Sequence, residues 1–136
     1  MSRYATTTDL TRLGLPSEAL SAVPSATQED SLDAMSAIAD GYLASRYALP
    51  LSAWGDDLRA QVSRLAAYDL MVTRGYDPAV GADENLLLRH DHAMRWLRDV
   101  ASGAVSPAGI VDATPSDTTD DETTFAVTSS SRGWRR

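Results

Sequence analysis

The fold of this chain is decided by residues 37–51, which read Ala-Ile-Ala-Asp-Gly-Tyr-Leu-Ala-Ser-Arg-Tyr-Ala-Leu-Pro-Leu. The first part continues the apolar spacing of an amphipathic helix, and an arginine flanked by tyrosines marks its end. Pro50 cannot continue a helix, and the residue before a proline avoids helical angles. The stretch therefore predicts a long helix that ends near Arg46 or Tyr47, followed by an extended link over residues 49–51.

Upstream of this stretch, apolar residues recur at steps of three and four, which indicates one face of a long helix. Pro24-Ser25 is expected to break the chain before it, and Thr27 is the expected N-cap because the acidic first turn 28–30 follows. The predicted face consists of Leu32, Met35, Ile38, Ala39, Tyr42, Leu43 and Tyr47.

Two short helices are expected in the first 24 residues. Thr6 caps the first, with Asp9 in its first turn, and Gly14 ends it. A second short turn of helix is expected over residues 16–22.

Two further long helices are predicted after the link. The first opens at Gly55-Asp56-Asp57 and ends at Gly75. The second has the cap-then-proline order at Asp77-Pro78, with the alternative that Gly81 delays regular helix until Ala82, and it ends at Gly103 as a left-handed cap. The inward residues of the first are Leu58, Val62, Leu65, Ala66, Leu70 and Met71. Those of the second are Leu86, Leu87, His90, Ala93, Met94, Leu97 and Ala101. The body is therefore predicted to be all-α.

Composition and charge limit the classes of function. The chain has 136 residues, a formal net charge of −7 and no cysteine, and its twelve basic residues are all arginine. An acidic protein of this kind is a poor clamp for duplex DNA, and a disulfide framework or thiolate metal site is excluded. No stretch approaches the ~20 apolar residues that span a bilayer, and the N-terminus lacks a signal peptide. We expect a soluble protein with no membrane partner.

The composition changes after Gly103. Residues 112–124 are acidic and rich in threonine, and they cannot bury enough apolar surface to fold alone. An alternating apolar run and an arginine-rich end follow, which is the layout of a docking anchor on a tether; the alternative is a terminus whose aromatic residues have no partner. We divide the chain into a helical domain, 1–106, and a tail, 107–136. The docking candidates are Phe125, Val127, Arg132, Trp134, Arg135 and Arg136.

The residues give little support to catalysis or to metal binding. His90 and His92 are two positions apart, so on a helix they point to different sides and cannot share one metal. His90 is expected to be half-buried packing and His92 exposed. The paired acids at 56–57 and 120–122 lie at a helix start and in the tail, where no rigid pocket separates their pKa values. We expect no catalytic residue, no metal and no cofactor.

Residues 38–51 resemble the signature of the Mu-like head–tail connector proteins, the head-completion adaptors of tailed phages. Residues 4–10, 65–70 and 93–103 agree with that family in kind and order, so the resemblance covers about residues 4–106. The block Tyr-Leu-x-x-Arg-Tyr-x-Leu-Pro carries most of it. The acidic tail departs from the simplest members of the family.

The resemblance implies a structural protein of the virion, made in the host cytoplasm, that forms a roughly dodecameric ring under the portal protein ring. Such a ring extends the channel, through which DNA passes without specific binding, and presents a surface to a tail or stopper protein. The tail end would engage the portal. Asp69 is expected to pair with an arginine such as Arg46 or Arg95, within or between subunits, or to be solvated. For the first three of the subunit-contact candidates, ordinary packing at the helix end is the alternative. The candidates are Tyr42, Arg46, Tyr47, Pro50 and Asp69.

Two alternatives remain from the residues alone. One is an assembly factor that does not stay in the particle. The other is a small helical regulatory, nucleic-acid-binding or protein-interaction module; a nucleic-acid module would show a basic recognition helix, which this sequence lacks.

Overall fold

The computed structural model describes residues 2–73 and 81–113, without the side chains of residues 73 and 81–83. Within these residues the chain is all-α, as predicted, with one isolated antiparallel bridge between Ala53 and Val111. The elements are α1 (Thr7–Asp9), the π-helical turn η1 (Leu10–Gly14), α2 (Ser17–Leu20), α3 (Ser25–Leu43), α4 (Asp56–Thr73) and α5 (Gly81–Ser102).

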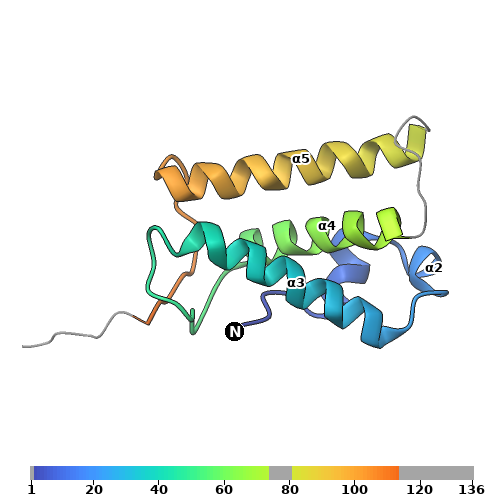
Figure 1. Cartoon of the computed structure of the whole chain (residues 1–136), viewed down its shortest axis with the longest axis horizontal. Coiled ribbons are helices and arrows are strands. Elements are labelled where there is room, and N and C mark those ends of the chain that lie inside the picture. The colour runs from blue at the N-terminus through green and yellow to red at the C-terminus, as the bar shows by residue number, and fades with distance from the viewer. Residues whose placement is uncertain (1, 74–80, 114–136) are drawn as a thin grey trace, which may run out of the picture.

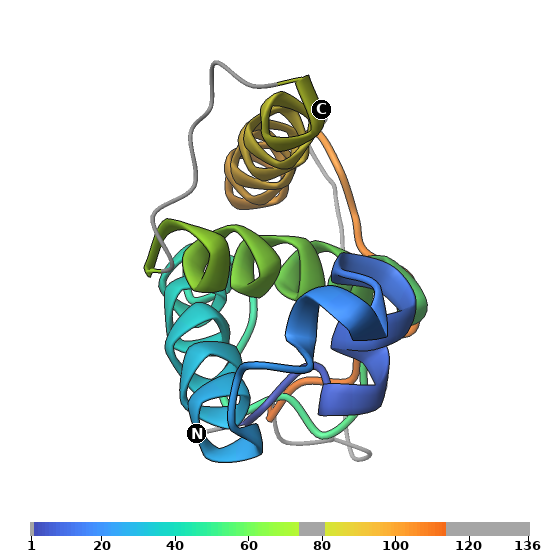
Figure 2. The ribbon, with the colours of Figure 1, turned by 90° about the vertical axis from the view of Figure 1, so that its right-hand side faces the viewer.

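α4 is the central helix of the molecule. It packs against α3, α5 and η1, and α5 runs along it on one side (Figure 1). Figure 2 shows α3 and the N-terminal elements side by side on the face of α4 that lies away from α5. The hydrophobic core is therefore built around α4 and not between two equal layers.

The predicted inner face of α4 is confirmed. Its members Leu58, Val62, Leu65, Ala66 and Leu70 are all buried, and Met71 is half-buried. This face works because apolar residues at steps of three and four form one stripe along a helix. The predicted ending at Gly75 and the predicted start at Asp77-Pro78 lie outside the described residues.

The inner face of α5 differs in part from the prediction. Ala93 and Leu97 are buried as expected, and Leu86 and Met94 pack against the core from its edge. Val100, which the pattern did not assign, is fully buried, whereas Ala101 is only half-buried. Gly103 follows with φ +91°, so the predicted left-handed cap is confirmed.

The first turn of the chain forms the predicted cap. The Thr6 hydroxyl accepts a hydrogen bond from the Asp9 amide (3.2 Å), and the Asp9 carboxylate accepts one from the Thr6 amide (3.0 Å). The helix then widens into η1, which ends at the predicted Gly14. A Cβ at Gly14 would lie 2.8 Å from the carbonyl oxygen of Ser63 on α4. Only glycine lets η1 approach α4 this closely.

The predicted start of α3 at Thr27 is wrong. The helix begins at Ser25, with Pro24 as its N-cap residue, and the carbonyl of Pro24 accepts the first helical bond from Gln28 (3.1 Å). A proline at a helix start loses no hydrogen bond and has a suitable φ, so Pro24 opens the helix directly, although a break over residues 24–25 was expected before it.

The end and the inner face of α3 also need correction. The regular helix ends at Leu43, although the amides of Arg46 and Tyr47 both still donate to the carbonyl of Leu43 (3.0 and 2.9 Å). Ile38, predicted to face inward, is 41% exposed, whereas Ser36 is fully buried. The helix is rotated toward the N-terminal segment because Ser36 has a partner there.

That partner is Tyr4, whose amide donates to the Ser36 hydroxyl (3.0 Å). The Tyr4 side chain is buried, its hydroxyl bonds to Asp40, and its ring meets the Trp54 ring edge-on with centroids 4.9 Å apart. Burial, followed by the bond to Asp40, raises the pKa of Tyr4 well above its usual value. The N-terminal segment is thus part of the core, which helical periodicity does not reveal.

Two glycine substitutions test the close contact of η1 with α4. Gly14→Ala should lower the free energy of unfolding by about 1–3 kcal/mol, because its Cβ meets the backbone of Ser63. Gly41→Ala, at a helical position with open space around it, should raise that free energy by roughly 0.5–1 kcal/mol. Urea denaturation followed by circular dichroism measures both. Equal effects of the two substitutions would contradict the close contact.

Candidate functional site

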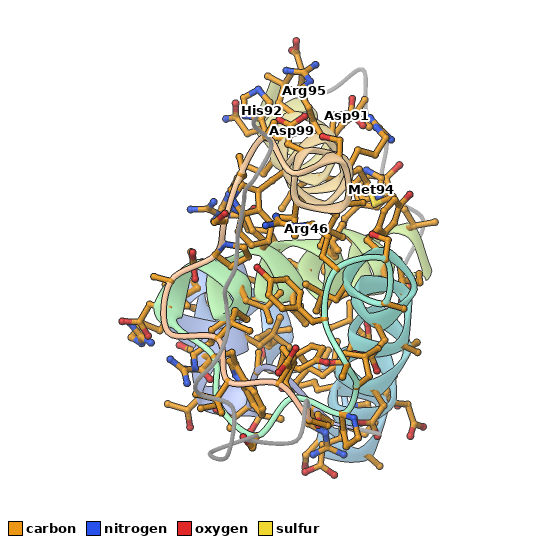
Figure 3. The ribbon with its side chains drawn as sticks, turned by 90° about the vertical axis from the view of Figure 1, so that its left-hand side faces the viewer. Arg46, Asp91, His92, Met94, Arg95 and Asp99 are labelled. Carbon is orange, nitrogen blue, oxygen red and sulfur yellow. The ribbon has the colours of Figure 1, made fainter. Side chains whose placement is uncertain are left out.

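Arg46 closes the C-terminal end of α5. Its Nη1 donates to the carbonyls of Val100 (3.1 Å) and Val105 (2.9 Å), and its Nη2 donates to the hydroxyl of Ser106 (3.4 Å). Figure 3 shows the Arg46 side chain beneath α5. A cation at the C-terminus of a helix also interacts favourably with the helix dipole. Arg46 therefore fixes the turn by which the chain leaves α5.

The other residues of the block around Arg46 are divided between core and surface. The guanidinium of Arg46 lies 5.4 Å from the centroid of the Tyr47 ring, within the range of a cation–π contact inside one chain. Tyr42 and Tyr47 are half-buried against the core. Pro50 is exposed, and the peptide bond between Leu49 and Pro50 is cis. Their role in contacts between subunits stays a prediction.

The first seven residues of the predicted tail, 107–113, lie along residues 48–57, which form the end of the link between α3 and α4 and the start of α4. We call these contacts the tail clip. The amide of Ser52 donates to the carbonyl of Val111 (2.8 Å), and the Val111 amide donates to the carbonyl of Ala53 (3.0 Å). Farther along, the amide of Ala113 donates to the carbonyl of Ala48 (2.7 Å). The clip therefore fixes where the rest of the tail begins.

The start of α4 holds the other end of the tail clip. The Asp57 carboxylate accepts from the amide of Leu58 (2.8 Å) and, through its other oxygen, from the amide of Ala108 (2.9 Å). A Cβ at Gly55 would lie 2.6 Å from the carbonyl oxygen of Ala108, and Gly109 has φ +68°. Both glycines are needed for this approach. The sequence predicted Asp57 only as part of a helix start, because its partner lies 51 residues away.

The predicted docking residues of the tail lie outside the described residues. They are Phe125, Val127, Arg132, Trp134, Arg135 and Arg136.

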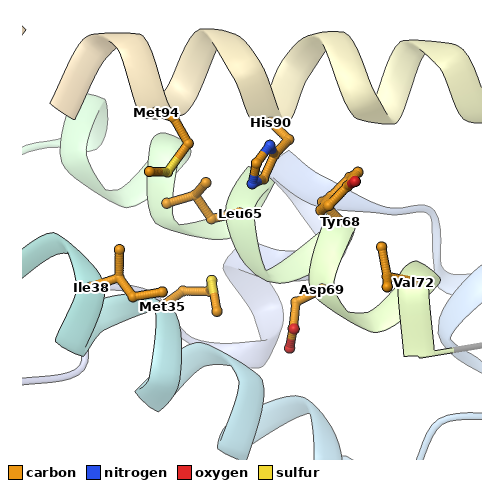
Figure 4. Close-up of a pocket in the computed structure, with 8 residues that line it drawn as sticks. All are labelled: Met35, Ile38, Leu65, Tyr68, Asp69, Val72, His90 and Met94. Carbon is orange, nitrogen blue, oxygen red and sulfur yellow. The ribbon is translucent and has the colours of Figure 1, made fainter. Parts of the chain in front are cut away.

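An apolar groove of about 230 Å³ opens between α3 and α5, with α4 as its floor (Figure 4). Ile38 and Val72 at its edge are 41% and 46% exposed. Apolar surface left open in this way is typical of contact sites. The groove is lined by Met35, Ile38, Leu65, Tyr68, Asp69, Val72, His90 and Met94.

Two polar residues of this groove were singled out from the sequence. Asp69 is half-buried and accepts a hydrogen bond from the hydroxyl of Ser31 (2.8 Å). Arg46, which was one of its predicted partners, donates to carbonyls at the end of α5. His90 stacks on Tyr68 with ring centroids 4.1 Å apart, which agrees with the expected half-buried packing. His92 and Arg95 lie on the outer side of α5 (Figure 3).

The described residues contain neither a cluster of metal-binding side chains nor a helix that could cross a membrane. No group of three or more histidine, cysteine, aspartate or glutamate side chains in residues 2–73 and 81–113 is arranged to hold a metal ion. Over the same residues, each helix is too short or too polar to cross a membrane.

Removing the Arg46 side chain tests how the tail clip is held. Arg46→Ala should accelerate amide hydrogen exchange at Val105 and Val111 roughly tenfold, because hydrogen bonds to a charged group contribute ~1.5 kcal/mol or more. Exchange at the buried α4 residue Val62 should stay unchanged. Arg98→Ala, at an exposed position of α5, is the matched control. Unchanged exchange at Val105 would show that Arg46 does not hold this turn.

Comparison with known proteins places the chain in a phage family. The search of curated proteins finds no match. The family described as Bacteriophage Mu, Gp36 matches residues 2–127. The match covers the helical body, the tail clip and the acidic stretch, and it ends before Arg132 and Trp134. Since it extends over most of the chain, the protein belongs to the bacteriophage Mu Gp36 family.

Proposed function

We propose that this protein is a head–tail connector of a tailed phage, a structural and non-catalytic subunit of the virion. About twelve copies would form a ring under the portal protein ring, extend the DNA channel and present a surface to a tail or stopper protein. Membership of the Mu Gp36 family supports a phage protein. The more specific role of a head–tail connector is our inference.

The observation that carries this proposal is the tail clip. A docking segment works best when its start is fixed on the body, since a fixed start raises the effective concentration of the anchor at its target. The contacts of Ala108, Val111 and Ala113 with residues 48–57, in the link and at the start of α4, supply such a fixed start. Repetition around a ring would turn a weak contact of each tail into a firm attachment.

Charge and surface support the same role. With a formal net charge of −7, a ring of these chains would repel phosphates, so that DNA slides through the channel without binding. The apolar groove between α3 and α5 gives the body uncovered surface of the kind that assembled subunits share.

The mass of the complex with the cognate portal ring tests the proposal. Native mass spectrometry or light scattering should show uptake of roughly one copy per portal subunit. Failure to bind, together with absence from purified particles, would reject the connector role and favour an assembly factor or a helical interaction module.

Deleting residues 125–136 tests the role of the tail end. The truncated protein should keep its helical content and its thermal unfolding temperature, because the described core lies within residues 2–113. Its uptake by the portal ring should fall at least tenfold, since the apolar and arginine side chains of the anchor are lost. Replacing Ser129, Ser130 and Ser131 by alanine should leave uptake unchanged. Full uptake of the truncated protein would contradict the assignment of the tail as the anchor.

A further inference from the structure

Two arginines lie close together where α4 and α5 meet the N-terminal elements. Arg89 on α5 donates to the carbonyls of Leu13 (2.6 Å) and Gly14 (3.2 Å) at the end of η1. Burial, and then the positive charge of Arg64 on α4, lower the pKa of Arg89. The two guanidinium groups therefore repel each other in a partly desolvated place. We call Arg64 and Arg89 the arginine pair.

The arginine pair lacks an anion in the part of the chain that the structure describes. Neither arginine forms an ion pair with a carboxylate there, and the buried Nε of Arg64 has no hydrogen-bond partner. One turn earlier on α4, the buried Oε1 of Gln61 is also without one. Buried polar groups are nearly always paired, so these two open groups, three residues apart on α4, indicate a missing ligand.

A groove of about 290 Å³ lies next to the arginine pair, with Arg89 in its wall. Its other walls are mostly apolar and come from the turn after η1, the start of α2, the end of α4 and α5. They include Leu15, Pro16, Ala19, Met71 and Leu86. The groove gives a peptide segment a place to lie beside the two charges.

The chemistry of the arginine pair selects carboxylates. A guanidinium presents parallel N–H groups that match the two oxygens of a carboxylate, and such bonds are stronger than those between neutral groups. Two adjacent guanidiniums fit a segment with several acids close together. A backbone amide of the same segment would satisfy the open Oε1 of Gln61.

We propose that the arginine pair and its groove bind residues 117–122 of a neighbouring copy of this chain. This segment reads Asp-Thr-Thr-Asp-Asp-Glu, and its four acids complement the two arginines. The proposal rests on the proposed function, because neighbours in a ring meet through two different faces, so that a basic site on one copy needs an acidic partner on the next.

The exit point of the tail favours a neighbour over the same chain. Ala113 is fixed to Ala48, and residues 117–122 follow it by only four to nine positions, which span at most ~30 Å when fully extended. In Figure 1 the orange segment that ends at residue 113 lies at one end of the molecule, whereas α2, beside the groove, lies at the other. A neighbouring copy brings its groove to the exit point.

A labelled peptide of residues 112–124 tests the site without any portal protein. It should bind the full-length protein in fluorescence anisotropy, more weakly as salt is added. Arg64→Glu should weaken binding at least tenfold and should keep or raise the thermal unfolding temperature, because it removes the repulsion with Arg89. Arg64→Gln should weaken binding in the same direction if Arg64→Glu perturbs the fold. Arg95→Glu, on the outer side of α5, should bind within twofold of the unchanged protein.

Three outcomes would overturn the proposal. The first is failure of the peptide to bind at low salt. The second is binding by both Arg64→Glu and Arg64→Gln as tight as that of the unchanged protein. The third is binding of a peptide whose acids are replaced by asparagine and glutamine as tight as that of the unchanged peptide. A second experiment asks whether the groove takes the chain's own tail or that of a neighbour. The acids of residues 117–122 are replaced by asparagine and glutamine in the full chain, and peptide binding is measured at concentrations where the protein is monomeric. Equal peptide affinity of the neutral and unchanged chains supports a neighbour, whereas tenfold tighter binding to the neutral chain would place the chain's own tail in its groove. The peptide assay contains no portal protein. If the portal ring does not take up the protein but the peptide still binds, the connector role is rejected and the peptide site is not.

Discussion

Burial of one face of α4 is the constraint on which the rest of the structure depends. Leu58, Val62 and Leu65 are almost fully buried, and α3, α5 and η1 each find their apolar partner on this helix. The carbonyl of Ser63 comes so close to η1 that a glycine is required at position 14. The two grooves described above, the one between α3 and α5 and the one beside the arginine pair, both have α4 residues in their walls.

Periodicity and capping rules predicted the helices well, because those signals are local. The cap at Thr6, the inner face of α4 and the left-handed Gly103 depend on neighbours within a few residues. The errors on α3 have a different origin. Pro24 has two opposite roles depending on whether the chain enters or leaves a helix, and Ile38 is exposed because a buried bond from Tyr4 to Ser36 sets the rotation of the helix.

The candidate site was less predictable, since its contacts join residues far apart in the sequence. The block around Arg46 was recognised, but the acceptors of Arg46 lie 54 to 60 positions away. Asp57 and Ala108 are similarly distant in the sequence, and the two arginines of the arginine pair lie on different helices, α4 and α5. No rule based on spacing along one helix finds such pairs. The sequence did indicate the acidic tail and its apolar and basic end, since composition alone distinguishes them.

The tail clip has a mechanical consequence. A pull on the tail beyond residue 113 loads first the hydrogen bond between Ala113 and Ala48, and then the bonds of Val111 with Ser52 and Ala53. These acceptors and donors belong to the link between α3 and α4, so the load passes to the start of the central helix instead of unwinding α5 from its last turn. Arg46 holds that last turn through its hydrogen bonds to the carbonyls of Val100 and Val105. Tension is thereby delivered to the best-packed part of the molecule, and α5 is kept out of its path.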